Sequence, residues 1–133
     1  MEPEESVLQG LEIIIEEQPA GGGVPVVHLK GEIDLHTCPE LRAALQNLME
    51  HGHFRIVLDL AQVPYLDSAA LGVLVDAVRR ARENGGGIYL VQVAPFVQRA
   101  FEITRLIKIF ELHNSIEEAQ AAAKEVPATE TGV

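Results

Sequence analysis

Apolar and polar residues alternate in short blocks along this chain. Five of the apolar blocks are compact and rich in β-branched side chains, which is typical of strands. They are LEIIIE at 11–16, VPVVHLK at 24–30, FRIVLDL at 54–60, IYLVQV at 88–93 and, as the weakest, IKIFEL at 107–112. The first two flank three glycines and are expected to pair as a hairpin, and the third is expected near the centre of a sheet.

A helix is predicted between the second and third of these blocks. Its apolar residues recur at helical spacing, at Leu41, Leu45, Leu48 and Met49. Thr37 and Glu40 have the spacing of a reciprocal capping box, Pro39 suits the first turn, and Gly52 stands where a helix would stop.

Three further helices are indicated. One opens at the sequence LDS and runs to the NGGG segment at 84–87, one begins at Pro95, and one is capped by Ser115 and Glu118. The resulting order is β-β-α-β-α-β-α-β-α, which predicts an α/β domain with a mixed, mostly parallel sheet of about five strands and about four helices. We expect one domain over 1–123 and a flexible C-terminal tail over 124–133.

Charge and composition restrict the partners of this domain. The chain has 133 residues, with Asp+Glu at 20 against Lys+Arg at 10 and a formal net charge of −10. Such a chain repels phosphate backbones and anionic lipids, so no direct nucleic-acid or membrane partner is expected. The single cysteine, Cys38, cannot form an internal disulfide, and the acidic start MEPEES does not look like a secretion signal. We therefore expect a cytoplasmic location.

Two polar residues stand side by side where the second helix begins. Either Asp67 or Ser68 could serve as its N-cap. A helix N-terminus also favours an anion, so a serine hydroxyl at this point could carry a phosphate that an outside enzyme transfers to it. Spacing alone leaves both interpretations open.

Two separated motifs carry a family resemblance. GEIDLHTCPELRAAL at 31–45, followed by VLDLAQVPYLDSAALGVL at 57–74, resembles the STAS family of bacterial anti-sigma factor antagonists over about residues 11–123. In that family the serine directly after the aspartate of the second motif is phosphorylated, and here it is Ser68. Ala69 and Ala70 stand where the family usually has Ser or Thr and Gly.

The resemblance implies a phosphorylation-gated binding protein and not an enzyme. The unmodified form would bind an anti-sigma factor that is also a serine kinase and so release a sigma factor. Phosphorylation of Ser68 would end that binding, and a phosphatase would restore it. No cofactor or metal is expected in the chain, because ATP and metal would belong to the partners. The implied partner surface comprises Asp34, Thr37, Asp67, Ala69 and Gly72, and a homodimer is compatible with the sequence.

Other interpretations of the same residues stay open at this stage. The chain could be a non-phosphorylated STAS scaffold subunit of a signalling or lipid-transport assembly, with Ser68 as a mere helix cap. Asp59, expected to end a central strand, invites comparison with the phospho-acceptor of receiver domains, which needs more acidic residues for Mg²⁺. A serine hydrolase would need a G-x-S-x-G elbow, which residues 66–70 lack. His36 and Cys38 alone make an incomplete metal site.

Overall fold

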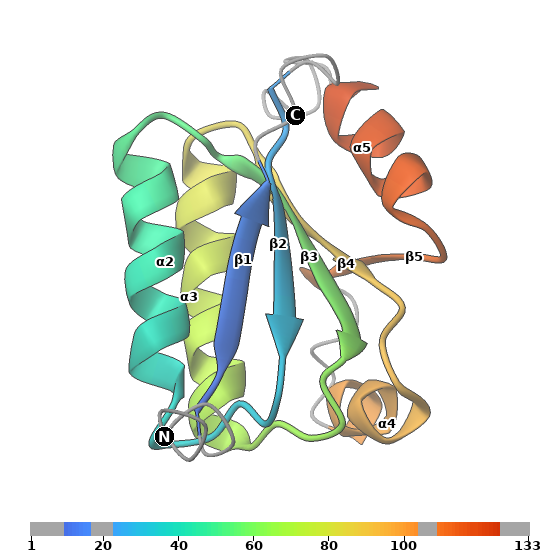
Figure 1. The fold of residues 1–133 in the computed structure, drawn as a ribbon. Coiled ribbons are helices and arrows are strands. Elements are labelled where there is room, and N and C mark those ends of the chain that lie inside the picture. The colour runs from blue at the N-terminus through green and yellow to red at the C-terminus, as the bar shows by residue number, and fades with distance from the viewer. Residues whose placement is uncertain (1–9, 17–22, 104–108, 126–133) are drawn as a thin grey trace.

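The structure is a computed structural model that describes residues 10–16, 23–103 and 109–125. The elements in these ranges are β1 (Glu12–Glu16), β2 (Val26–Lys30), α2 (Cys38–Glu50), β3 (Arg55–Gln62), α3 (Ser68–Glu83), β4 (Gly87–Val91), α4 (Pro95–Ile103), β5 (Glu111–His113) and α5 (Ile116–Glu125). Their order is the predicted β-β-α-β-α-β-α-β-α alternation (Figure 1).

The five strands form one mixed sheet in which each strand lies beside its neighbour in the sequence, in the order β1-β2-β3-β4-β5. β1 pairs with β2 in antiparallel register, and the other three pairs are parallel. The predicted mixed, mostly parallel sheet is confirmed, and β3 occupies its centre. Parallel neighbours need crossover connections, and the helices between the strands supply them.

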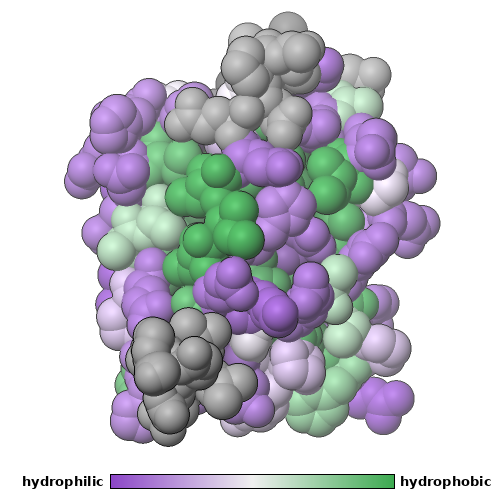
Figure 2. Space-filling model, in the orientation of Figure 1, coloured by the Kyte–Doolittle hydropathy of each residue, from purple (hydrophilic) through white to green (hydrophobic). Residues whose placement is uncertain are grey.

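Helices cover both faces of this sheet. Figure 1 shows α2 and α3 side by side against one face and α5 against the other. In the same orientation, Figure 2 shows apolar residues gathered over the edge strand β1, where Ile14 and Ile15 are exposed. Alternate residues of β3 divide accordingly. Ile56 and Leu58 join the larger core with α2 and α3, whereas Val57 joins a smaller core with Ala119 and Ala123 of α5. No helix in the described ranges is both long enough and apolar enough to cross a lipid bilayer.

The predicted helix boundaries are mostly confirmed. Pro39 lies in the first turn of α2, and Gly52 follows its end with a φ of 89°, a conformation that glycine adopts without strain. Ser115 caps α5, since its Oγ accepts a hydrogen bond of 3.1 Å from the Glu118 backbone N–H. The predicted capping box at Thr37 is wrong, because the Thr37 side chain makes no capping hydrogen bond to α2.

The last strand differs from its prediction over 107–112. β5 begins only at Glu111, and residues 107–108 lie outside the described part of the chain. Phe110 is buried in the larger core instead, where its ring lies 5.0 Å from that of Phe101 in α4. Phe110 therefore packs against α4, and the chain enters the sheet directly after it.

The predicted domain end at residue 123 can be compared with α5, which continues to Glu125. The rest of the predicted tail, 126–133, lies outside the described residues, as do residues 17–22 of the hairpin connection.

A cluster of three ionisable side chains links β1, β2 and β3. His28 of β2 places its Nδ1 atom 2.8 Å from Asp59 Oδ2 of β3 and its Nε2 atom 3.1 Å from Glu16 Oε1 of β1. Burial is the largest single influence and lowers the pKa of His28, but the hydrogen bonds and charges of Glu16 and Asp59 together outweigh it. The pKa of His28 is therefore raised, and the imidazolium donates to both carboxylates.

We expect this cluster to make stability depend on pH. Since the folded pKa is raised above the unfolded value of about 6.5, the contribution of His28 is complete below that pH and is lost as pH rises through the folded pKa. Urea unfolding of the parent and of His28→Gln between acidic and alkaline pH should show a difference in the free energy of unfolding that shrinks as pH rises. His53→Gln is the control. A difference that grows with pH would contradict the expectation.

Candidate functional site

Ser68 is the first residue of α3 and its side chain is exposed. Its hydroxyl forms no hydrogen bond with the described part of the chain, and neither do the backbone N–H groups of Ser68 and Ala69. The site lies at the edge of the sheet where β2 and β3 end and α2 and α3 begin (Figure 1). The side chain of Ser68 is therefore accessible from outside the domain.

Asp67 is the N-cap of α3. Its Oδ1 atom accepts a 3.0 Å hydrogen bond from the Ala70 N–H, which is the usual capping contact. Its Oδ2 atom accepts another 3.0 Å bond from the backbone N–H of Leu35, in the loop before α2. Both carboxylate oxygens thus have structural tasks, and one side chain links the two sequence motifs. Because Asp67 supplies the cap, the hydroxyl of Ser68 is left free.

The backbone also joins these two motifs. The Ile33 N–H donates to the Tyr65 carbonyl at 3.1 Å, and the Asp67 N–H donates to the Ile33 carbonyl at 3.1 Å. The two segments therefore run parallel for a short distance, with Ile33 opposite Leu66. This bridge fixes the loop before α2 directly beside the start of α3.

Asp34 organises the loop that precedes α2. Its Oδ1 atom accepts hydrogen bonds from the backbone N–H groups of Thr37 at 3.0 Å and His36 at 2.9 Å. The pKa of Asp34 is lowered, chiefly by the bond from the Thr37 backbone, with the His36 bond acting in the same direction and burial opposing both. Its Oδ2 atom accepts nothing from the described residues, so this oxygen is available to a binding partner.

Thr37 is buried, with 5% of its surface exposed. Its Oγ1 atom donates to the Glu32 carbonyl at 2.9 Å and accepts from the Asp34 N–H at 2.9 Å. The hydroxyl of Thr37, which the resemblance assigns to the partner surface, is used by the loop itself. Thr37 holds the shape of the loop and offers a partner almost no area.

The small residues after Ser68 differ in their surroundings. Ala69 is half-buried, Ala70 is fully buried, and Gly72 is exposed. A Cβ atom added at Gly72 would meet no atom of the described chain within 4 Å, so close packing inside the fold is not what Gly72 provides. Gly72 leaves the surface of α3 low one turn after Ser68. Ala70 contributes to the core and not to the surface.

Three exposed apolar side chains near the start of α3 were not singled out from the sequence. They are Leu35, Tyr65 and Phe96, which are 67%, 39% and 60% exposed. Tyr65 precedes Ser68 by three residues, and its ring stacks on that of Phe96 at 6.1 Å. Leu35 is held against the same segment through its bond to Asp67. In the sequence, these residues differ from core residues only in that each lies outside the periodic apolar positions that predict the buried face of a helix or strand.

The receiver-domain and metal interpretations can be compared with the surroundings of Asp59 and Cys38 in the described residues. Asp59 does not end its strand, since β3 continues to Gln62, and its carboxylate is engaged by His28 and by the Ala61 N–H. Within the described ranges no group of three or more His, Cys, Asp or Glu side chains could hold a metal ion. Cys38 is buried in the larger core.

Removing the Asp67 carboxylate should have a clear effect on stability. Asp67→Ala loses the cap, about 1 kcal/mol, and the bond to Leu35, about 1 kcal/mol more, so the free energy of unfolding should fall by about 2 kcal/mol. Asp67→Asn keeps one accepting oxygen and should lose about half as much. Urea unfolding measures both, and an Asp67→Ala variant as stable as the parent would show that the link is unimportant.

Comparison with known proteins agrees with this geometry. The family model of the STAS domain matches residues 17–119. BtrV of Bordetella bronchiseptica, provisionally named an anti-sigma factor antagonist, is 33% identical over 102 residues, which are 77% of this chain and 88% of BtrV. The anti-sigma-B factor antagonist of Staphylococcus epidermidis is 31% identical over 91 residues, 68% of this chain and 84% of that protein.

A solved structure extends the likeness to three dimensions. The crystal structure of an anti-sigma factor antagonist from Mycobacterium paratuberculosis superposes with a TM-score of 0.76 at 28% sequence identity, over 86% of this chain and 95% of that one. The family match covers both motifs that meet at Asp67. The chain therefore belongs to the STAS domain family, the family of the anti-sigma factor antagonists.

Proposed function

We propose that this protein is an anti-sigma factor antagonist that is switched by phosphorylation of Ser68. In the unmodified state it binds an anti-sigma factor that is also a serine kinase, and the anti-sigma factor then releases its sigma factor. Phosphorylation by that kinase ends the binding, and a phosphatase restores it. The names of the relatives from Bordetella and Staphylococcus support the class of function.

One observation carries the switch. The Ser68 hydroxyl is exposed and makes no hydrogen bond to the described residues at the start of α3, while the neighbouring Asp67 performs the capping that a serine could otherwise do. A hydroxyl that takes part in no internal hydrogen bond can be modified without loss of a structural contact. The fold should therefore survive phosphorylation unchanged.

The surroundings of Ser68 support a protein partner. Leu35, Tyr65 and Phe96 are large, exposed and apolar. Aromatic side chains such as those of Tyr65 and Phe96 are enriched at protein interfaces. Asp34 adds a carboxylate oxygen that is free to accept a hydrogen bond, and Gly72 lets a partner backbone approach α3. The partner surface that we propose thus comprises Ser68, Asp34, Ala69 and Gly72 with these three apolar residues, with Asp67 as its internal support.

A phosphate on Ser68 would oppose docking at this surface. It adds about −1.5 to −2 charges and a tightly hydrated group. If burial of that group beneath a partner costs about 3 kcal/mol, the affinity falls about a hundredfold. The free N–H groups of Ser68 and Ala69 and the helix dipole can hold the phosphate in the unbound protein, although the Asp67 carboxylate repels it. The modification therefore changes binding more than folding.

Phosphate transfer in the presence of the kinase tests this proposal. Purified protein is incubated with its cognate anti-sigma factor kinase and radioactive ATP, and the parent should take up one phosphate that mass spectrometry locates on Ser68. Ser68→Ala should take up none, and Ser115→Ala should label like the parent. Equal labelling of Ser68→Ala and the parent would place the modification elsewhere. Absence of label from all three proteins would favour a scaffold that is never phosphorylated.

A further inference from the structure

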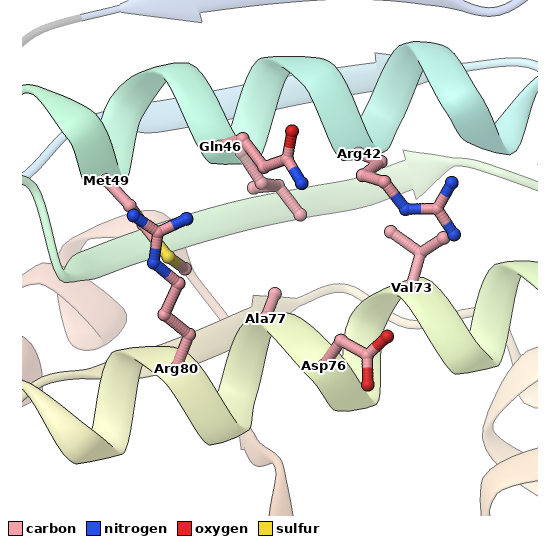
Figure 3. A pocket seen from close by; sticks show the side chains of 8 residues that line it. Arg42, Gln46, Met49, Val73, Asp76, Ala77 and Arg80 are labelled. Atoms are coloured by element: carbon pink, nitrogen blue, oxygen red, sulfur yellow. The ribbon is translucent and has the colours of Figure 1, made fainter.

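A shallow groove runs between α2 and α3, away from Ser68. Its lining residues alternate between apolar and charged or polar: Arg42, Leu45, Gln46 and Met49 of α2, and Val73, Asp76, Ala77 and Arg80 of α3. Figure 3 shows Arg42 at one end beside Val73, and Arg80 at the other end beside Met49. The volume of about 100 Å³ is well below the roughly 300–1,000 Å³ of small-molecule sites, so the groove suits a protein side chain better than a ligand.

Two arginines of this groove have no partner in the part of the chain that the structure describes. Within the described residues, the guanidinium groups of Arg42 and Arg80 form neither a hydrogen bond nor an ion pair. The neighbouring Arg79 and Arg82 behave differently, since Arg79 pairs with Asp76 at 3.5 Å and Arg82 donates to the Ile109 carbonyl at 3.0 Å. The formal net charge of the chain is −10. Because Arg42 and Arg80 have no partner among the described residues, they give this groove a positive charge at each end.

The groove also has an apolar floor. Leu45, Met49, Val73 and Ala77 are buried members of the larger core and form its base. The one acidic lining residue, Asp76, is already paired with Arg79. A binding partner would therefore meet a narrow strip of apolar atoms in the middle, since these four side chains are almost fully buried, and a cation at each end.

We propose that this groove binds an acidic amphipathic helix of a partner protein. Arg42 and Met49 are seven residues apart on α2, which is two helical turns or about 10 Å, and Figure 3 places Arg80 beside Met49. Two glutamates seven positions apart on a bound helix have the same separation and would meet both guanidinium groups. Leucines between them would lie over the apolar floor, as in other helix-in-groove complexes.

The proposal does not depend on phosphorylation at Ser68, because no lining residue belongs to the surface around that serine. The groove is thus a second docking surface on the helical side of the domain. A partner could occupy it in either state of the switch.

A designed peptide tests the groove directly. The probe is a synthetic amphipathic helical peptide with glutamates seven positions apart and two leucines between them, titrated into ¹⁵N-labelled protein. Saturable shifts should concentrate on the amides of residues 42–49 and 73–80. Arg42→Glu with Arg80→Glu should lower the affinity at least about tenfold, and Arg42→Gln with Arg80→Gln should have a smaller effect. Replacing both glutamates of the peptide by lysine should restore binding to the charge-reversed variant.

A matched pair of variants separates local binding from general attraction. Arg99→Glu with Lys124→Glu changes the net charge equally at exposed basic residues outside the groove and should leave the affinity within about twofold of the parent. Ser68→Asp should bind the peptide like the parent, which keeps this test apart from that of the proposed function. An equal loss in the control pair, shifts outside the groove, absence of saturable binding, or self-association of the parent through the groove would each overturn the proposal.

Discussion

Gly86→Ala is expected to destabilise the protein by at least about 3 kcal/mol. A Cβ atom built on Gly86 would overlap the backbone carbonyl oxygen of Phe54 and lie 2.9 Å from its Cβ atom. The same carbonyl accepts a 2.8 Å hydrogen bond from the Gly87 N–H, where β4 begins beside β3. Because the obstacle is backbone and not a flexible side chain, relief of the overlap requires that the two central strands shift apart.

Gly72→Ala is the matched control for this substitution. A Cβ atom at Gly72 meets no described atom within 4 Å, and alanine is a better helix former than glycine. This variant should be as stable as the parent or more stable by up to about 1 kcal/mol. Urea or thermal unfolding measures both changes. A Gly86→Ala protein as stable as Gly72→Ala would show that the strands at this position can adjust freely.

Ser68→Asp is expected to weaken binding to the anti-sigma factor at least about tenfold, or about 1.4 kcal/mol. The substitution places one fixed negative charge on a surface whose exposed large side chains, Leu35, Tyr65 and Phe96, are apolar. The charge must lose its hydration when a partner covers it, and Asp67 nearby adds repulsion. Ser68→Ala adds no charge to this surface and should bind the anti-sigma factor within about twofold of the parent.

Calorimetry or surface plasmon resonance with the purified anti-sigma factor measures these affinities. The unfolding free energies of both variants should stay within about 0.5 kcal/mol of the parent, since the Ser68 side chain makes no internal hydrogen bond to the described residues. A Ser68→Asp protein that binds as tightly as Ser68→Ala would remove Ser68 from the docking surface.

Much of this fold could be predicted because local patterns and tertiary structure agree. The run at 54–60 buries Ile56 and Leu58 on one face and Val57 on the other, and β3 is the central strand with helices on both sides. The alternation of elements predicted a mostly parallel sheet, and the one antiparallel pair is the N-terminal hairpin. Gly52 and Ser115 were informative since each acts through its immediate neighbours in the chain.

The errors have a common physical cause. The threonine at position 37 has ordinary capping-box spacing, yet the loop before α2 uses its hydroxyl first. Phe110 belongs to a run that has the composition of a strand, but its ring packs against Phe101 of α4. In both cases another contact took precedence over the predicted one, within the loop for Thr37 and between elements for Phe110.

The candidate site was predicted only in part. The exposed position of Ser68 at the start of a helix follows from the sequence, because the helix stripe and the two adjacent polar residues are local. The double role of Asp67 does not follow, since its second contact is to Leu35, 32 residues away. The apolar contributions of Tyr65 and Phe96 depend on how α4 returns to the β3–α3 connection, which no local pattern specifies.

A comparison of the phosphorylated and unphosphorylated forms of the protein tests the central claim most directly. Protein carrying one phosphate on Ser68 is titrated against the anti-sigma factor, and its unfolding is measured beside that of the unmodified form. We expect the affinity to fall about a hundredfold while the free energy of unfolding changes by less than about 1 kcal/mol. Equal affinity of the two forms would contradict the account, and so would loss of affinity through unfolding of the domain.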